Sequence, residues 1–229
     1  MNSKLTNTIR HILDEWLPPF IRDSRWFMYP FYYLAYRGRN IKAVMNFKQN
    51  YFTWNENELR DFYANLNSIS RNRKTDLTEK CFEMLLKQLD GEYRNVLDVG
   101  CSSGYVLSRI HEVYPELSLT GIDFIAGADN PEIRFVNADV RTLPFENRSF
   151  DVVICSHTIE HIFELHDFID ELKRVTRKKL IVVTPKQRYY FYSLDEHLQF
   201  FPQREQLTTN LDFERFTCEN VEGDWFFVG

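Results

Sequence analysis

Two glycines enclose a run of three small residues in the stretch N-V-L-D-V-G-C-S-S-G-Y-V-L-S-R-I, residues 95–110. A short apolar run precedes Gly100, and a helix-like pattern follows Gly104. Glycine adopts backbone conformations that other residues avoid, and it lets a ligand approach the main chain at a helix N-terminus. The stretch predicts a binding loop between a strand and a helix. A tight turn without a ligand would show the same pattern.

Acidic residues follow the next two β-rich runs of the chain. Asp123 lies 19 residues beyond Gly104, and Asp139 closes the run after that. A carboxylate at a strand end can accept hydrogen bonds from both hydroxyls of a ribose, which is the role we expect for Asp123. Asp139 could accept the exocyclic amine of an adenine, with Val140 beside the ring.

The loop departs from the dinucleotide fingerprint G-x-G-x-x-G. That fingerprint needs glycine at positions 102 and 105, where Ser102 and Tyr105 stand. Tight packing around a pyrophosphate is therefore disfavoured. The acids fit an adenosine that carries no pyrophosphate.

Strand-like and helix-like segments alternate from residue 95 onward. Strands are expected over 96–99, 117–123, 133–139, 151–156 and 179–185, and helices over 105–113 and 161–177. This alternation predicts a parallel sheet that binds ligands outside the carboxyl ends of its strands. Residues 55–90 read as helices that stop at Asp90 and Gly91.

These motifs together resemble the class I S-adenosylmethionine-dependent methyltransferases. V-L-D-V-G-C-S-S-G is similar to their glycine loop, G-I-D to their ribose-binding acid, and 137–162 to their third and fourth strands with the intervening loop. The stretch from D-E-H-L-Q-F-F-P to G-D-W-F-F-V-G resembles the closing helix and hairpin of that fold. Ser102 departs from the family, whose middle loop residue is glycine.

The resemblance, from about residue 92 to the end, implies an α/β fold. It is a Rossmann-like, seven-stranded, mostly parallel sheet with a C-terminal antiparallel hairpin, preceded here by an N-terminal helical cap. The implied cofactor is S-adenosyl-L-methionine. The implied cofactor-binding residues are Asp98, Gly100, Cys101, Ser102, Gly104, Asp123, Phe124, Asp139, Val140 and Ser156.

Methyl transfer to an oxygen also needs a base for the acceptor's proton, and histidine suits that role near neutral pH. His157 directly follows the fourth expected strand, His161 lies at a helix start, and His197 lies in the loop after the fifth strand. Each is a candidate base, and His161 could equally be structural.

Two other functions remain open at this stage. H-T-I-E-H, residues 157–161, fits the H-x-x-E-H zinc-hydrolase pattern, with Glu160 as base. That pattern belongs inside a helix, whereas here it begins at a strand end, so we expect no metal. A catalytically inactive binding module is the second alternative, supported by Ser102 and by the aromatic N-terminal segment.

Composition narrows the function classes. The net charge of −5 over 229 residues argues against a general nucleic-acid binder. Four scattered cysteines without a C-x-x-C pair are typical of reduced thiols in a cytosolic protein. The chain shows neither a membrane-spanning run nor a signal-peptide pattern, so a cytoplasmic location is expected.

The N-terminal part differs in charge and in aromatic content. Residues 1–50 carry eight Lys and Arg against three acids, a net charge of +5, which leaves −10 for the remainder. We expect residues 1–90 to form an aromatic-rich helical cap or lid, with residues between Trp26 and Arg73 lining an acceptor pocket, and 91–229 to bind the cofactor. Peripheral membrane contact is the alternative use of the aromatics.

The expected acceptor is a small molecule, and the expected methylated atom is an oxygen of a sugar or of a sugar-linked or secondary metabolite. Aromatic faces stack on sugar rings, and arginines suit a phosphate or carboxylate on the acceptor. The N-terminal segment loosely resembles extensions of bacterial methyltransferases of glycan and secondary-metabolite pathways. The sequence leaves the oligomeric state open.

Overall fold

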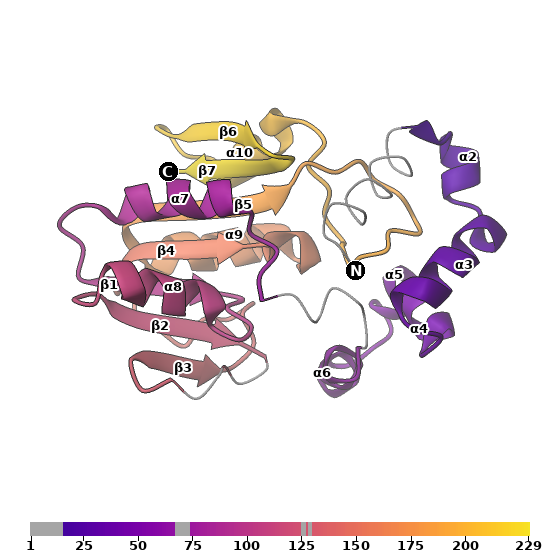
Figure 1. The fold of residues 1–229 in the computed structure, drawn as a ribbon, viewed down its shortest axis with the longest axis horizontal. Coiled ribbons are helices and arrows are strands. Elements are labelled where there is room, and N and C mark those ends of the chain that lie inside the picture. Colours follow the sequence, from indigo (N-terminus) through magenta and orange to yellow (C-terminus); the bar gives the residue numbers. More distant parts are fainter. Residues whose placement is uncertain (1–15, 67–73, 125–126, 128–129) are drawn as a thin grey trace. The chain divides into compact units, whose positions relative to one another are not determined.

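The computed structural model describes residues 16–66, 74–124, 127 and 130–229, and Figure 1 shows their elements. The chain divides into two compact units. One comprises Met1–Arg73 with Gln187–Leu198, and the other comprises Lys74–Lys186 with Gln199–Gly229. The division falls before Lys74, ahead of the boundary at residue 90 that the sequence suggested. The segment after the fifth strand belongs to the first unit.

A seven-stranded sheet forms the second unit, in the order β3-β2-β1-β4-β5-β7-β6. Its strands are β1 (Asn95–Val99), β2 (Ser118–Asp123), β3 (Ile133–Asn137), β4 (Phe150–Ser156), β5 (Thr176–Pro185), β6 (Thr217–Val221) and β7 (Asp224–Val228). The pairs among β1 to β5 are parallel, and β7 pairs antiparallel with β5 and β6. This topology confirms the predicted fold class, a mostly parallel Rossmann-like sheet closed by an antiparallel hairpin.

Alternate residues along the central strands enter two separate cores, one on each face of the sheet. Along β4, Val153 and Cys155 belong to one core, whereas Val152 and Ile154 belong to the other. Successive side chains of a strand point to opposite faces, so a strand buried on both faces must be apolar throughout. That requirement explains the continuous apolar run V-V-I-C, residues 152–155.

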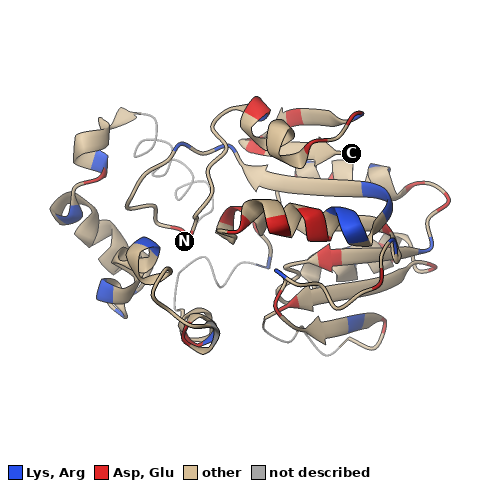
Figure 2. Ribbon diagram, turned by 180° about the vertical axis from the view of Figure 1, so that it is seen from behind, with Lys and Arg blue, Asp and Glu red and all other residues tan. Residues whose placement is uncertain are grey.

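Helices cover both faces, as Figures 1 and 2 show. α7 (Glu79–Leu89) and α8 (Tyr105–Val113) cover one face, and α9 (Leu165–Val175) and α10 (Arg204–Leu211) cover the other. A three-residue 3-10 helix, η3 (Ile159–His161), precedes α9. α9 buries residues at helical spacing, namely Leu165, Phe168, Ile169, Leu172 and Val175.

The first unit is helical. It contains α2 (Pro19–Arg22), α3 (Arg25–Ala35), α4 (Ile41–Met45), α5 (Phe47–Asn50) and α6 (Glu56–Ala64). α6 begins with a capping box, in which the Asn55 side chain accepts from the Glu58 N–H and the Glu58 side chain accepts from the Asn55 N–H. A helix is therefore present at the start of the range 55–90, where the sequence predicted helices.

Side chains of these helices hold the segment 187–198 by its main chain. Tyr32 donates to the Ser193 carbonyl, and Tyr36 donates to the Leu194 carbonyl and the Glu196 carboxylate. Further bonds run from Arg22 to the Tyr192 carbonyl, from Lys48 to the Tyr190 carbonyl and from the Phe191 N–H to Asp23. Buried main-chain groups need such partners, because this segment has no strand or helix to supply them.

Arg22→Met tests this attachment. Arg22 is buried and also lies 4.6 Å from the centre of the Tyr190 ring. Losing a charged donor to a main-chain carbonyl should cost about 1.5–3 kcal/mol. Hydrogen exchange followed by mass spectrometry should then show faster exchange in 187–198 and α3, and unchanged exchange in β1 and β4. Arg25→Met, at an exposed neighbouring position, is the control, and equal effects of both variants would contradict the prediction.

Candidate functional site

Parallel strands bring the candidate residues to one edge of the sheet. β1 ends before Gly100, β2 ends at Asp123, and β4 ends at Ser156. In the strand register Val99 lies beside both Ile122 and Cys155. The three strand ends are therefore neighbours, as the sequence predicted.

The main chain of β2 anchors the glycine loop. The N–H groups of Gly100 and Cys101 donate to the Ile122 carbonyl at 2.8 and 3.2 Å, and the Gly104 N–H donates to the Cys101 carbonyl at 2.8 Å. Cys101 is buried beneath the loop. The loop is thus a fixed turn whose remaining N–H groups lead into the first turn of α8.

Close contacts require both glycines. A Cβ on Gly100 would lie 2.0 Å from Oγ1 of Thr158, and a Cβ on Gly104 would lie 2.4 Å from Cζ of Phe135. Both residues also have positive φ, at 80° and 75°. The lack of side chains at these glycines therefore permits close packing against β3 and against the chain after β4, whether or not a ligand is bound.

Ser102, the departure from the family loop, adopts the backbone conformation of a glycine. Its φ is 48°, its side chain is exposed, and its N–H donates to Oδ2 of Asp123 at 2.8 Å. A left-handed conformation costs a residue with a Cβ about 1–2 kcal/mol. The loop therefore keeps its shape at an energetic cost, and one carboxylate oxygen of Asp123 is oriented by the loop.

Asp98 lies at the same edge but is buried. Burial raises the pKa of its carboxyl group to about 7, and the neighbouring charge of Asp123 acts in the same direction. A buried carboxylate of this kind gains from a cationic partner such as an ammonium group. Asp98 therefore suits an amino group of a ligand that reaches the loop.

Asp139 already has a partner within the protein. Arg141 contacts its carboxylate through Nη2 at 2.6 Å and Nε at 2.9 Å, and the Arg141 N–H donates to Oδ1 at 2.8 Å. Val140 is buried beside it. An adenine amine would have to share this carboxylate with Arg141.

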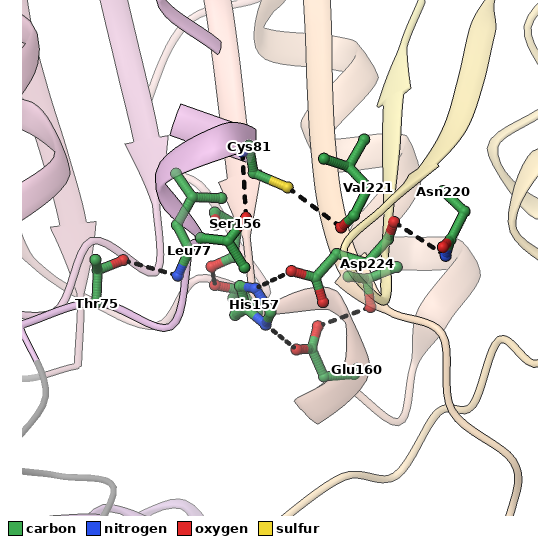
Figure 3. A network of polar contacts seen from close by, with 12 residues as sticks. Thr75, Leu77, Cys81, Ser156, His157, Glu160, Asn220, Val221 and Asp224 are labelled. Atoms are coloured by element: carbon green, nitrogen blue, oxygen red, sulfur yellow. Dashed lines mark hydrogen bonds and ion pairs between the residues drawn. The ribbon is translucent and has the colours of Figure 1, made fainter. Parts of the chain in front are cut away.

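His157 lies between two carboxylates, as Figure 3 shows. Its Nδ1 is 3.4 Å from Oε1 of Glu160, and its Nε2 is 3.5 Å from Oδ2 of Asp224. Burial by itself lowers the pKa of the imidazole, but Asp224 and Glu160 outweigh it and raise the pKa to about 10. The two carboxylates therefore favour the imidazolium form of His157, which has no lone pair with which to accept a proton.

The fold explains how this cluster assembles. β7 runs antiparallel to β5, with Pro185 opposite Asp224, so the first residue of β7 reaches the carboxyl edge of the parallel strands. Glu160 follows β4 on η3 and is buried, and its Oε2 accepts from Oγ1 of Thr184 at 3.1 Å. Asp224, Glu160 and Thr184 were not predicted as residues of a methyltransferase site. Asp224 could have been suspected from the sequence, because it follows Gly223 at the start of the last strand.

The other two histidines lie in different units. His161 ends η3 and is half-buried. His197 is buried in the segment 187–198 of the first unit, with its Nδ1 2.6 Å from Oε1 of Gln187. A base role for any of the three histidines remains a prediction.

The zinc-hydrolase pattern lacks the helix that it requires. His157 has a left-handed φ of 51°, and only residues 159–161 are helical, in a single 3-10 turn. The two histidines are therefore not successive positions on an α-helix face. An imidazolium held by two carboxylates is also a poor metal ligand, because metal binding needs the neutral ring.

Comparison with known proteins agrees with this site. Residues 97–183 match a family described as a methyltransferase domain. A probable S-adenosylmethionine-dependent methyltransferase of Mycolicibacterium smegmatis is 30% identical over 59% of this chain and 57% of its own. The malonyl-acyl-carrier-protein O-methyltransferase of Bacillus anthracis is 27% identical over 47% of this chain and 45% of its own.

A solved structure shows the same fold. The PH0226 protein of Pyrococcus horikoshii superposes over 69% of this chain and 96% of its own with a TM-score of 0.52, at 17% identity. Residues 97–183 therefore carry a methyltransferase domain, similar to that of S-adenosylmethionine-dependent methyltransferases. The chain spans about half the length of the curated relatives it matches.

The residues at the edge fit the cofactor of this family. The loop offers left-handed main chain at Gly100, Ser102 and Gly104, as a close approach to a ligand requires. Asp123 is a half-buried carboxylate at a strand end, which suits a ribose diol, and Asp98 suits an ammonium group. These residues therefore match S-adenosyl-L-methionine, which carries both a ribose diol and an amino group.

Ser102→Gly should relieve the strain in the loop. The relief of about 1–2 kcal/mol exceeds the entropy cost of glycine, about 0.5–1 kcal/mol, so the free energy of unfolding should stay equal or rise. Affinity for S-adenosylhomocysteine, measured by calorimetry, should change less than about twofold, because the free loop already holds this conformation and the strain is the same with and without ligand. Ser103→Gly is the control, because Ser103 has no positive φ to relieve. Equal destabilisation by both substitutions would refute the prediction.

His157→Gln should change how stability depends on pH. The folded-state pKa of about 10 lies above the ordinary 6.5, so the native protein holds the extra proton between these values. The stability from this proton is complete below pH 6.5 and is lost as pH rises through 10. The difference in free energy of unfolding between the parent and the variant should therefore fall as the pH rises from 6.5 to 10, by at most about 1.4 kcal/mol per pH unit.

Denaturant titrations of both proteins at several pH values measure this difference. Lys48, whose pKa burial lowers to about 7, titrates in the same range in both proteins and cancels. Parallel pH profiles for parent and variant would show that His157 is not held as a cation.

Proposed function

We propose that this chain transfers a methyl group from S-adenosyl-L-methionine to an oxygen of a small-molecule acceptor. The observation that carries the proposal is the meeting of the glycine loop, Asp98 and Asp123 at one edge of the sheet, with the Ser102 N–H orienting the Asp123 carboxylate at 2.8 Å.

The bound cofactor would supply a methyl group on a sulfonium, which an acceptor oxygen displaces in line. The protein's own part is mainly alignment and exclusion of water. Asp123 would hold the ribose, Asp98 the amino group, and the loop main chain the segment between them. Phe124, Val140 and Ser156 follow strand ends at the same edge and would complete the cofactor contacts.

The acceptor's proton needs a separate group. As an imidazolium, His157 would donate hydrogen bonds to an acceptor oxygen or to Asp224. It would therefore position these groups, and it would not remove a proton. His161 and His197 remain the candidate bases among the residues first considered. A catalytically inactive module is the alternative if the strain at Ser102 prevents cofactor binding.

The acceptor class rests on chemistry. Aromatic rings and arginines of the helical unit other than those exposed on and beside α3 would suit a sugar ring that carries a phosphate or carboxylate. Relatives named for malonyl-acyl-carrier-protein O-methylation and for ajmaline N-methylation use different acceptors, so they leave this choice open. The lid role expected for residues 1–90 is part of the proposal.

Asp123→Ala tests the cofactor site. The parent should bind S-adenosylhomocysteine with micromolar-range affinity, and the variant at least about tenfold more weakly, since a charge-assisted hydrogen bond contributes about 1.5–3 kcal/mol. Isothermal titration calorimetry measures both. Asp170→Ala, at an exposed position of α9, is the control and should bind as the parent does. No binding by the parent, or equal binding by both aspartate variants, would refute the assignment.

A further inference from the structure

α3 presents apolar side chains on two faces. Met28 and Tyr32 are buried on one face, within the core of the helical unit. Trp26, Tyr29 and Tyr33 follow one another at helical spacing on another face and are 90%, 48% and 53% exposed. The rings of Tyr29 and Tyr33 lie 6.5 Å apart between centres, so the exposed aromatics form a continuous stripe.

Other large exposed apolar side chains lie close by in the chain. Among the described residues, six of the eleven exposed large hydrophobic side chains fall within residues 16–34. These six are Trp16, Phe20, Trp26, Tyr29, Tyr33 and Leu34. We call the α3 stripe of Trp26, Tyr29 and Tyr33 the aromatic face. Soluble proteins seldom expose apolar side chains at this density unless a partner covers them.

The exposed charges of the same segment are positive. Arg25, Arg37, Arg39 and Lys42 are exposed. Asp23 is the one acid within residues 16–54, and its carboxylate accepts the Phe191 N–H inside the unit. Figure 2 shows Lys and Arg recurring along these helices. The segment therefore offers aromatic rings together with uncompensated positive charge.

We propose that the aromatic face docks on an anionic phospholipid surface and lies in the headgroup region. Trp and Tyr prefer that region, because their rings have an apolar body and a polar edge. Arginine and lysine beside them are attracted to anionic headgroups, each strengthening binding about fivefold. α3 has 11 residues, which suits a helix lying in the interface and is too short to cross a bilayer.

Charge favours this occupant over a second copy of the chain. Two aromatic faces brought together would also bring their arginines together, with no acid in residues 16–54 free of internal bonds to offset them. A bilayer that contains anionic lipid supplies the missing negative charge. Among the residues that the structure describes, no helix has the length and apolar character needed to span a membrane, so contact would be peripheral.

Vesicle sedimentation tests the proposal. The full chain is mixed with vesicles of phosphatidylcholine with one-quarter phosphatidylglycerol, or of phosphatidylcholine alone, at low and high salt. The protein should sediment with the anionic vesicles at low salt, its tryptophan emission should shift to the blue, and high salt should release it.

Two variants probe the two components. Trp26→Ser with Tyr33→Ser removes aromatic rings, and Arg37→Gln with Arg39→Gln and Lys42→Gln removes charge. Each variant should lower the constant for partitioning of the protein onto anionic vesicles at least about tenfold. Two control variants change exposed residues of the sheet unit. They are Val113→Ser for the apolar change, and the triple variant Lys80→Gln, Lys87→Gln and Arg134→Gln for the charge change. Each control should alter the partition constant less than about twofold. Circular dichroism establishes that each variant is folded.

Three outcomes would overturn the proposal. The parent could fail to bind anionic vesicles at low salt, or the control variants could lose binding as much as the test variants. The third is a parent that is dimeric in sedimentation equilibrium and becomes monomeric with Trp26→Ser and Tyr33→Ser, which would make the face a contact between copies. None of these outcomes depends on methyl transfer, so they are separate from a failure of the proposed function.

Discussion

The contact between Gly100 and Thr158 is the constraint on which the rest of the site depends. The Thr158 side chain occupies the space that a Cβ of Gly100 would need, 2.0 Å from that position, and its Oγ1 lies 3.1 Å from the Val99 carbonyl. The ends of β1 and β4 are thereby fixed together. The loop that follows β1 and the left-handed turn at His157 that follows β4 both start from this contact.

Charge at this edge is arranged at a cost to stability. Asp98 is buried with a raised pKa, and Glu160 and Asp224 are buried around one imidazolium. Buried carboxylates are expensive unless a cation offsets them. His157 offsets two of them within the protein, whereas Asp98 has most to gain from a ligand that brings its own positive charge. A ligand whose positive charge offsets Asp98 would therefore raise the free energy of unfolding of the protein.

The parallel sheet and its edge could be predicted because both depend on local patterns. Apolar runs mark buried strands, and the glycines and Asp123 follow them directly, so topology alone brings them together. The C-terminal hairpin followed from the family resemblance, and helices within residues 55–90 were expected from the sequence. The family resemblance supplied the cofactor.

Other features depend on contacts between residues far apart in the chain. The protonation of His157 is set by Asp224, which only the antiparallel register of β7 brings near it. The pairing of Asp139 with Arg141 could not be distinguished from a free carboxylate by spacing. Likewise, nothing in the sequence showed that segment 187–198 joins the N-terminal helices, because its bonds run through main-chain groups that carry no residue signature.

A crystal structure of the chain with S-adenosylhomocysteine would locate every group of the ligand and so test whether the glycine loop, Asp98 and Asp123 bind the cofactor. We expect the ribose hydroxyls on the Asp123 carboxylate, the amino group toward Asp98, and the main chain of Gly100–Gly104 against the ligand between them. Ligand bound elsewhere on the protein, or no ligand bound at saturating concentration with the loop intact, would contradict this assignment.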